Sequence, residues 1–334
     1  MTEVGVVVVG RNEGPRLGPC LRSVLRCTRT LLYVDSGSRD DSVAQARQTG
    51  VPLLQLDPGR PFSAARARNE GFQQLLSQHP WLQYVQFVDG DCQLDAEWLQ
   101  RGRELLSQQR QVTVVCGRIR ELRPEASPYN RMCALEWDQP AGEVRASGGN
   151  LMVRVSAFRD LGGFRDDVLA AEDDELCLRV RRAGGRIYLL DAPMVLHDAD
   201  VLRFSQWWRR ARRCGQAYAQ GFALHGRPPQ NHFRRETRSL ILWGALWPLL
   251  VALVGSFTRG AGLFLLAAYP ALGLRIVRHG LGRGWPLRHA VLYAVFTVLS
   301  KFPGVLGMLH FHLQLWRGHA PSLIEHKEMR LGHE

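Results

Sequence analysis

Two aspartates, Asp89 and Asp91, stand one residue apart around Gly90, directly after the apolar run Tyr84–Val88. An apolar, β-rich run that stops at two acids predicts a strand with both carboxylates at its carboxyl end, where open α/β sheets bind ligands. Two carboxylates held this close repel each other, so a cation would stabilise the pair. Carboxylate oxygens suit Mg²⁺ or Mn²⁺, and such ions usually bring a phosphate with them. The alternative is an acidic turn, because Asp and Gly are common turn residues.

Another acid, Asp35, follows the second strand-like run, Leu31–Val34. A carboxylate at a strand end can accept hydrogen bonds from a base imide or a ribose, and Gly37 permits a close approach. The alternative is a capped turn that starts the next helix, a role that Asp40 or Asp41 would fill equally well.

The elements that must position these acids alternate between strand-like and helix-like segments. The expected series is Val4–Val9, Leu17–Arg26, Leu31–Val34, Ser42–Gln48, Pro52–Leu56, Ser63–Ser77, Tyr84–Asp89, Asp95–Gln108 and Val112–Cys116. Such alternation predicts an α/β fold with a mostly parallel sheet flanked by helices on both faces. The strand ends at Gly10, Asp35 and Asp89 would then line one crevice. The loop after the first strand has neither Gly-x-Gly-x-x-Gly nor a phosphate-loop lysine, which argues against a dinucleotide fold.

Charge and cysteine content narrow the class of protein. The 334 residues carry a formal net charge of +12, almost all of it from arginine. The segment 203–238 contains nine arginines and only one acidic residue, Glu236, and it directly precedes the apolar part of the chain. This favours a juxtamembrane segment facing anionic lipid over a nucleic-acid surface. The seven scattered cysteines form no Cys-x-x-Cys, which fits a reducing cytosol, and the N-terminus offers no signal peptide.

Six motifs in order resemble the family-2 glycosyltransferases, which share the nucleotide-sugar-binding fold called GT-A. The resemblance covers roughly residues 4–200. The matching segments are Arg11-Asn12-Glu13, Asp35-Ser36-Gly37-Ser38, Ala67-Arg68-Asn69-x-Gly71, Phe87-Val88-Asp89-Gly90-Asp91, Ser147-Gly148-Gly149-Asn150-Leu151-Met152, and Gly162-Gly163-Phe164 with Glu172-Asp173-Asp174-Glu175 about ten residues on.

The resemblance implies roles on the donor side. Asp35 would contact the base of the nucleotide, Asp89 the ribose or the metal, and Asp91 the divalent ion, Mg²⁺ or Mn²⁺, that bridges the diphosphate. That ion would stabilise the negative charge of the leaving nucleoside diphosphate. Arg68 would add a fixed positive charge near the phosphates, unless it is a surface arginine. The resemblance also assigns nucleotide-sugar binding to Asn12, Glu13, Gly149 and Asn150, although residues 148–150 also fit a hairpin turn.

The remaining roles concern the base and a further metal ligand. By resemblance, Asp173 is the general base that deprotonates the acceptor hydroxyl, and the neighbouring acids Glu172 and Asp174 are rival candidates. The ordinary alternative for the four acids is a solvated helix start. His197 is a candidate metal ligand, with a structural histidine as the alternative. Processive synthases of this clan carry Gln-x-x-Arg-Trp, whereas Gln206–Arg210 ends in Arg here, which favours transfer of a single sugar.

The C-terminal part of the chain is apolar. Leu240–Phe257 contains no charge over eighteen residues, about 27 Å as a helix, which is just enough to span a hydrocarbon core. Gly260–Leu274 and Ala290–Trp316 are further apolar stretches. A membrane hairpin with both flanks in the cytosol is expected from the first two, with a buried helical subdomain as the alternative. Whether Ala290–Trp316 crosses the membrane or lies flat stays open.

The sequence therefore predicts four regions: a GT-A-like catalytic domain (1–202), a basic juxtamembrane segment (203–238), hydrophobic helices (239–316) and a polar tail (317–334). The predicted activity is metal-dependent, inverting transfer of one sugar from a nucleotide-sugar donor to a lipid-linked or envelope-glycan acceptor. It would take place at the cytosolic face of the membrane, with no nucleic-acid partner. The alternatives are a nucleotidyltransferase and a non-catalytic scaffold that only binds nucleotide sugar.

Overall fold

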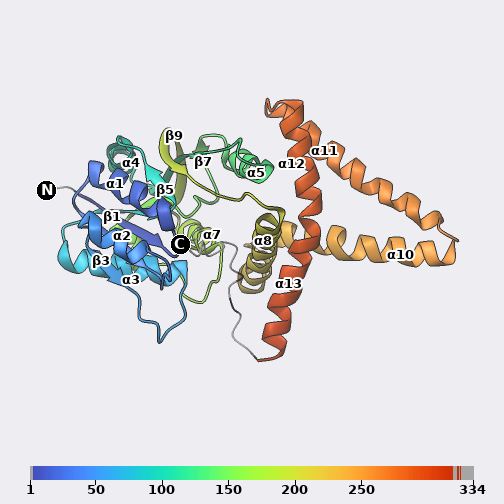
Figure 1. The fold of residues 1–334 in the computed structure, drawn as a ribbon, viewed down its shortest axis with the longest axis horizontal. Coiled ribbons are helices and arrows are strands. Elements are labelled where there is room, and N and C mark those ends of the chain that lie inside the picture. The colour runs from blue at the N-terminus through green and yellow to red at the C-terminus, as the bar shows by residue number, and fades with distance from the viewer. Residues whose placement is uncertain (1–2, 319–321, 323, 325–334) are drawn as a thin grey trace. The chain divides into compact units, whose positions relative to one another are not determined.

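The computed structural model describes residues 3–318, 322 and 324, which fall into two compact units (Figure 1). The sheet unit comprises residues 3–123 and 136–200, and the helical unit comprises residues 124–135 and the described residues from 201 on. The short segment 124–135 thus belongs with the C-terminal helices rather than with the sheet that precedes it. Most of the polar tail predicted over 317–334 lies outside the described residues.

A nine-stranded mixed sheet forms the centre of the sheet unit. Its strands are β1 (Val4–Gly10), β2 (Leu31–Asp35), β3 (Leu53–Gln55), β4 (Tyr84–Asp89), β5 (Cys92–Leu94), β6 (Val112–Glu121), β7 (Gly142–Glu143), β8 (Leu151–Arg154) and β9 (Arg186–His197). The strand order is β3-β2-β1-β4-β8-β6-β9-β5, with β7 paired to β9. The first four strands are parallel, whereas β8 runs antiparallel between β4 and β6.

Helices cover both faces of this sheet, as the alternating pattern predicts. One face packs against α1 (Leu17–Cys27), α2 (Ser42–Thr49) and α4 (Trp98–Gln108), and the other against α3 (Ala64–Gln78), α6 (Val155–Asp160) and α7 (Glu172–Arg182). β1 is buried along its whole length because its side chains alternate between these two cores.

The parallel register brings the predicted strand ends together. Gly10 pairs with Asp35 of β2, and Val9 pairs with Asp89 of β4. The carboxyl ends of β1, β2 and β4 therefore share one edge of the sheet, so the predicted alignment of these ends is confirmed. The four acids 172–175 form the first turn of α7, which begins at Glu172, because acidic side chains favour the N-terminal end of a helix.

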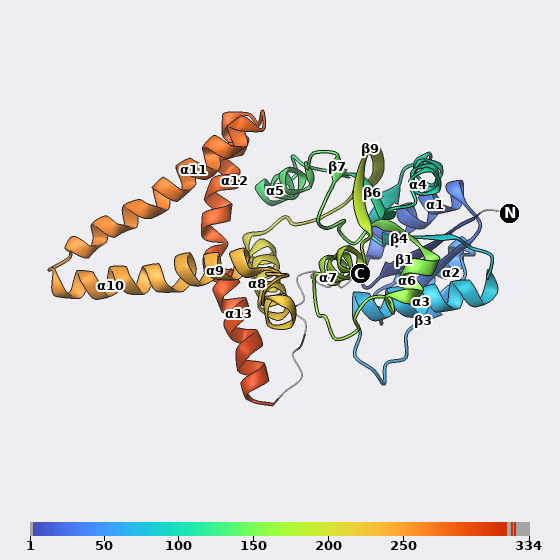
Figure 2. The ribbon, with the colours of Figure 1, turned by 180° about the vertical axis from the view of Figure 1, so that it is seen from behind.

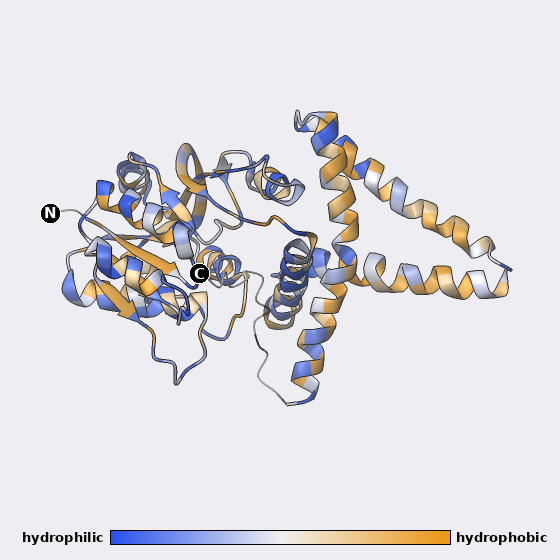
Figure 3. Cartoon of the chain, viewed as in Figure 1, coloured by the Kyte–Doolittle hydropathy of each residue, from blue (hydrophilic) through white to orange (hydrophobic). Residues whose placement is uncertain are grey.

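The helical unit contains the apolar C-terminal segments. It holds most of α5 (Pro128–Trp137), then α8 (Phe204–His225), α9 (Arg234–Ile241), a π-helical turn (Leu242–Leu246), α10 (Trp247–Phe257), a 3₁₀ turn (Ala261–Ala267), α11 (Ala268–Gly282), α12 (Leu287–Leu299) and α13 (Lys301–Trp316). Three continuous helices are long and apolar enough to cross a membrane, namely Arg234–Phe257, Ala261–Gly282 and Leu287–Trp316. Apolar residues dominate α10 and much of α11 to α13 in Figure 3, whereas α8 is largely hydrophilic.

Candidate active site

Arg68 is the charged centre of the candidate site. It lies in the second turn of α3, whose first turn is capped by the hydroxyl of Ser63. The side chain is 3% exposed, and its two terminal nitrogens donate to different carboxylates, one to Asp89 at 2.7 Å and the other to Glu172. The guanidinium also lies over the ring of Phe164, 5.4 Å from its centroid. Arg68 thus joins the end of β4 to the first turn of α7.

Asn150 holds Asp89 from another side. The backbone N–H of Asp89 donates to Asn150 Oδ1 at 3.0 Å, and Asn150 Nδ2 donates to Asp89 Oδ2 at 3.2 Å. Both carboxylate oxygens of Asp89 therefore have protein donors, although its side chain is still 31% exposed. The acid is fixed in orientation and open to solvent on one side, which is what a ligand-contacting carboxylate requires.

Gly149 lets the chain approach this ion pair closely. A Cβ at this position would lie 2.6 Å from Arg68 Nη2 and 2.8 Å from Asp89 Oδ2, both too short for a real contact. Glycine is therefore the residue that permits the 148–150 segment to pass beside the Arg68–Asp89 pair.

The acidic run at the start of α7 is largely enclosed rather than solvated. Glu172 and Glu175 are buried, and each has an arginine partner, Glu172 with Arg68 and Glu175 with Arg179 at 2.7 Å. Burial raises the pKa of Asp173 well above its usual value, and the neighbouring carboxylates of Asp174 and Glu172 raise it further, while Arg68 opposes them. A carboxylate with a raised pKa beside a fixed cation is suited to accept a proton.

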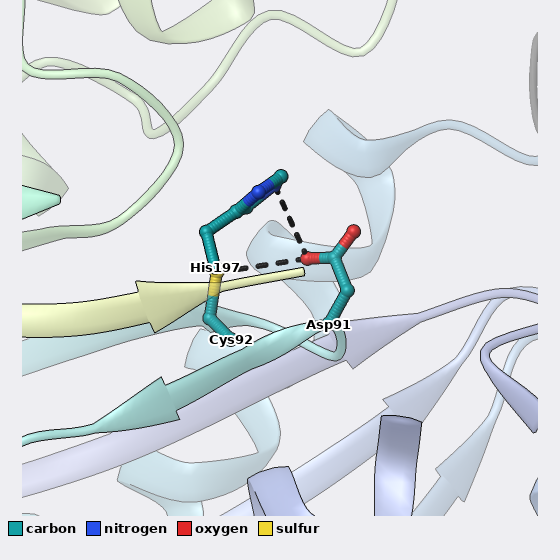
Figure 4. A group of neighbouring side chains, drawn as sticks. All are labelled: Asp91, Cys92 and His197. Atoms are coloured by element: carbon teal, nitrogen blue, oxygen red, sulfur yellow. Dashed lines mark hydrogen bonds and ion pairs between the residues drawn. The ribbon is translucent and has the colours of Figure 1, made fainter. Parts of the chain in front are cut away.

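A second group lies where β4, β5 and β9 meet. Asp91 follows β4, and its Oδ1 lies 3.6 Å from the Cys92 thiol and 3.7 Å from His197 Nε2 (Figure 4). One ligand atom from each of these three side chains lies within 4.8 Å of the others. Burial and the Asp91 carboxylate raise the pKa of the Cys92 thiol well above its usual value. The carboxylate and the imidazole are the donors of this group that suit Mg²⁺ or Mn²⁺, whereas a thiol suits softer ions.

His197 has a second acidic neighbour that sequence reasoning did not identify. Its Nδ1 lies 3.6 Å from Glu121 Oε2, and the ring of Trp137 packs edge-on at a centroid distance of 4.4 Å. Burial lowers the pKa of His197, but Asp91 and Glu121 more than offset this, so the pKa is raised overall. Glu121 pairs directly with His197 across β6 and β9. It stands at the end of a long strand and belongs to no motif, so the sequence held no signal for it.

Asp35, Asn12 and Glu13 lie in the loops at the same edge of the sheet. Asp35 is buried; its Oδ2 accepts backbone N–H groups from Gly37 at 3.0 Å and Ser38 at 2.9 Å, so the acid also holds its own turn. Asn12 links this turn to the first loop, because its backbone N–H donates to the Ser38 hydroxyl at 2.9 Å. Glu13 is buried, and its carboxylate forms an ion pair of 3.1 Å with Arg16, the residue before α1. The predicted role of Asp35 in base contact stays a prediction.

The predicted residues thus gather into three neighbouring groups at the carboxyl ends of the parallel strands. Asp89 belongs with Arg68 and Asn150, and among the described residues it is not part of the group around Asp91 and His197. A separate depression of about 930 Å³ runs along α3 and the loop after α6, and its lining contains none of the predicted site residues.

Two family models match this chain. The model "Glycosyl transferase family 2" matches residues 5–161, and "Glycosyl transferase family group 2" matches residues 132–296. Together they extend from β1 into α12 and include the candidate site.

Individual glycosyltransferases also match this chain. Glycosyltransferase AglE of Haloferax volcanii is 26% identical over 234 residues, which is 66% of this chain and 74% of the relative. The pre-mycofactocin glycosyltransferase of Mycobacterium tuberculosis is 29% identical over 214 residues, 59% of this chain but only 43% of the relative. Among solved structures, the mannosyltransferase PcManGT from Pyrobaculum calidifontis, in complex with GDP-Man and Mn²⁺, matches with a TM-score of 0.59 at 18% identity, over 92% of this chain and 87% of that one. The last likeness concerns the fold, which is GT-A-like.

Proposed function

Because this chain belongs to the family-2 glycosyltransferases and is an enzyme that uses a nucleotide-sugar donor, we propose that it transfers one sugar with inversion, in a reaction that depends on a divalent cation. The acceptor we propose is a lipid-linked or envelope glycan presented at the cytosolic face of a membrane. Family membership sets aside the nucleotidyltransferase and the scaffold as alternatives.

The observation that carries this proposal is the buried bridge from Asp89 through Arg68 to Glu172. It ties the strand end that would face the donor to the helix that carries Asp173. In such an arrangement one cation fixes the donor-side acid and also helps to keep the neighbouring base ionised, since Arg68 lowers the pKa of Asp173. Positioning of this kind supplies a large part of a transfer reaction's acceleration.

Asp173 is the group that we assign as general base. Its raised pKa makes it a better proton acceptor than an exposed aspartate once it is ionised. An inverting transfer needs only one carboxylate, which takes the proton from the acceptor hydroxyl as that oxygen attacks the anomeric carbon. Glu172 is less suited to this role because Arg68 already occupies it, and Asp174 stays a rival.

Asp91 and His197 are the residues that we assign to the divalent cation. Their donor atoms lie close together, and a carboxylate oxygen with an imidazole nitrogen is a set that suits Mn²⁺ or Mg²⁺ better than the neighbouring thiol does. A bound ion would supply positive charge for the diphosphate that leaves with the nucleoside. The presence of Mn²⁺ with GDP-Man in the mannosyltransferase of similar fold supports this assignment.

The membrane part of the proposal rests on α10 and α11. Apolar side chains are exposed along most of this hairpin, for example 66% at Leu249 and 58% at Leu253 in α10, and 84% at Phe264 in the 3₁₀ turn between the two helices. Exposed apolar surface on this scale marks a membrane or partner surface. An acceptor carried on a lipid would be delivered to an enzyme anchored in this way.

The activity is tested with the full chain in detergent or nanodiscs and a panel of nucleotide sugars, with and without Mn²⁺. We expect one donor to bind, and its nucleoside diphosphate to be released faster when an acceptor glycolipid and Mn²⁺ are present. The anomeric configuration of the product, determined by NMR, tests inversion. Donor binding without turnover under any of these conditions, or a retained configuration, would contradict the proposal.

A further inference from the structure

The third apolar helix, Leu287–Trp316, differs from the other two in how its surface is arranged. Most of its large exposed side chains recur at helical spacing along one side, Leu315 being the exception, whereas most of its opposite side packs against protein. The exposed stripe consists of Leu287, Val291, Val295, Leu299, Leu306, Leu309, Leu313 and Trp316, with exposures between 37% and 82%. Every interval is three, four or seven residues, so these side chains share one face over the full length of α12 and α13.

The opposite face carries small and polar residues beside the buried apolar side chains of Met308 and Phe311. Gly304 and Gly307 are buried there, and Thr297, Ser300 and Lys301 lie on the same side of the helix. A helix with one exposed apolar side and one packed side is compatible with a position in the plane of a membrane surface.

The packed face meets α8 at the middle of the candidate span. A Cβ on Gly307 would overlap the backbone carbonyl of Arg212, and a Cβ on Gly215 would overlap that of Gly304. The two backbones therefore touch at Gly304 and Gly307, just past the middle of Leu287–Trp316. Because the backbones touch, this part of α13 and the neighbouring turns of α8 must lie at nearly the same depth in a bilayer.

The middle of α8 is strongly basic. Arg209, Arg210, Arg212 and Arg213 surround the contact with α13, and Lys301 lies close by on α13 itself. If Leu287–Trp316 crossed the bilayer, these five cations would be drawn toward the hydrocarbon centre, where charged side chains are least tolerated. At the interface the same arginines would face water and anionic headgroups.

The direction of α10 agrees with this reasoning, whereas α11 runs obliquely and packs against α12 (Figure 1). In both views α12 and α13 run across the direction of α10 rather than alongside it, and α8 lies on the side away from the α10–α11 hairpin (Figures 1 and 2). With the hairpin inserted along the membrane normal, α12 and α13 would lie along the surface, and the exposed stripe would face the lipid.

From these observations we propose that α12 and α13 form one interfacial helix that does not cross the membrane. Its stripe from Leu287 to Trp316 lies at the boundary between headgroups and acyl chains, and α8 covers it on the water side. This assignment rests on the membrane association proposed above, and it gives the chain two crossings rather than three.

Spin-label depth measurements in proteoliposomes of anionic and zwitterionic lipid test the proposal. The half-buried Cys27 and Cys214 are first replaced by serine, which leaves five buried cysteines. Nitroxide labels are then placed singly on the stripe, as Val291→Cys, Leu306→Cys and Leu313→Cys. Their depth follows from relaxation by oxygen in the lipid and by a water-soluble nickel chelate.

An interfacial helix predicts the same shallow depth at all three sites, within a few ångströms. A crossing helix predicts a deep label at Leu306 and shallow ones at Val291 and Leu313, since 22 residues of helix span about 33 Å. That profile would overturn the proposal, and so would full exposure to water at all three sites. Leu249→Cys and Leu253→Cys on α10 test the hairpin separately. Water-exposed labels there contradict its insertion, whatever the stripe reports.

Discussion

Replacement of Arg68 by methionine tests the bridge at the centre of the candidate site. Arg68 is 3% exposed, and its partner Glu172 is 8% exposed, so the substitution leaves a buried carboxylate without its cation. Breaking a buried ion pair in this way costs about 3–5 kcal/mol. Asp89 is 31% exposed and keeps its hydrogen bond from Asn150, so the loss of its partner adds little to this cost. We therefore expect the free energy of unfolding to fall by about 3 kcal/mol, the lower end of that range.

The pair Arg68–Glu172 can be separated from simple loss of packing by a double-mutant cycle. In Glu172→Gln, Arg68 keeps Asp89 as a partner, so a loss of only about 1–2 kcal/mol is expected. The double variant Arg68→Met/Glu172→Gln lacks the stranded charge and should be more stable than the sum of the single losses implies, by about 1–3 kcal/mol.

Thiol labelling under increasing urea is the suitable assay once Cys27, Cys133 and Cys214 are replaced by serine, because the remaining four thiols then report the sheet unit alone. Cys20, Cys92, Cys116 and Cys177 are buried in that unit, and they react only when it opens. Losses that add within about 0.5 kcal/mol would show that the two side chains do not interact, and they would refute the bridge. Arg68→Lys serves as a further comparison, since a lysine keeps the charge but cannot span two carboxylates in a fixed fork.

Three further predictions concern the chemistry. Gly149→Ala places a Cβ against both Arg68 and Asp89, so donor affinity measured by calorimetry should fall at least tenfold; unchanged affinity would mean that the 148–150 segment is not held beside the donor. Asp91→Ala should abolish Mn²⁺-stimulated release of nucleoside diphosphate and weaken Mn²⁺ binding measured by electron paramagnetic resonance, and retained stimulation would remove Asp91 from the metal site. The raised pKa of Asp173 means that the base loses its ionised form well above the ordinary aspartate value of about 4, so kcat should fall as the pH drops through that higher pKa; an acid limb at about pH 4 would contradict this.

Much of the site could be predicted because its strand-end acids stand directly after strands that the sequence itself indicates. Asp35 and Asp89 each follow an apolar run, and parallel pairing with β1 then brings the strand ends together. Most strands and helices of the first 116 residues follow from their hydrophobic spacing, but β5, which is only three residues long, was not predicted. The antiparallel placement of β8 between β4 and β6 could not be predicted, because a strand's pattern does not name its partner.

Interactions between distant segments were beyond sequence reasoning. From the sequence, the acidic run at residues 172–175 fits a solvated helix start. Only the fold shows that Arg68, which is 104 residues away from Glu172 in the chain, forms a buried ion pair with it. Glu121 was not predicted as a site residue because its contact with His197 depends on the register of β6 and β9. Likewise, the composition of Leu287–Trp316 permits a crossing helix, and the arguments for an interfacial one, its contact with α8 among them, come from the fold.

The central claim is that Asp173 accepts the proton in transfer from a nucleotide-sugar donor. Asp173→Asn removes the base with almost no change in shape, so the measurement is the rate of acceptor glycosylation together with the donor dissociation constant. The account predicts a rate lower by about 10²- to 10⁴-fold with donor affinity unchanged within about threefold. Transfer at the wild-type rate in a variant that binds donor normally would place the base elsewhere and contradict the account.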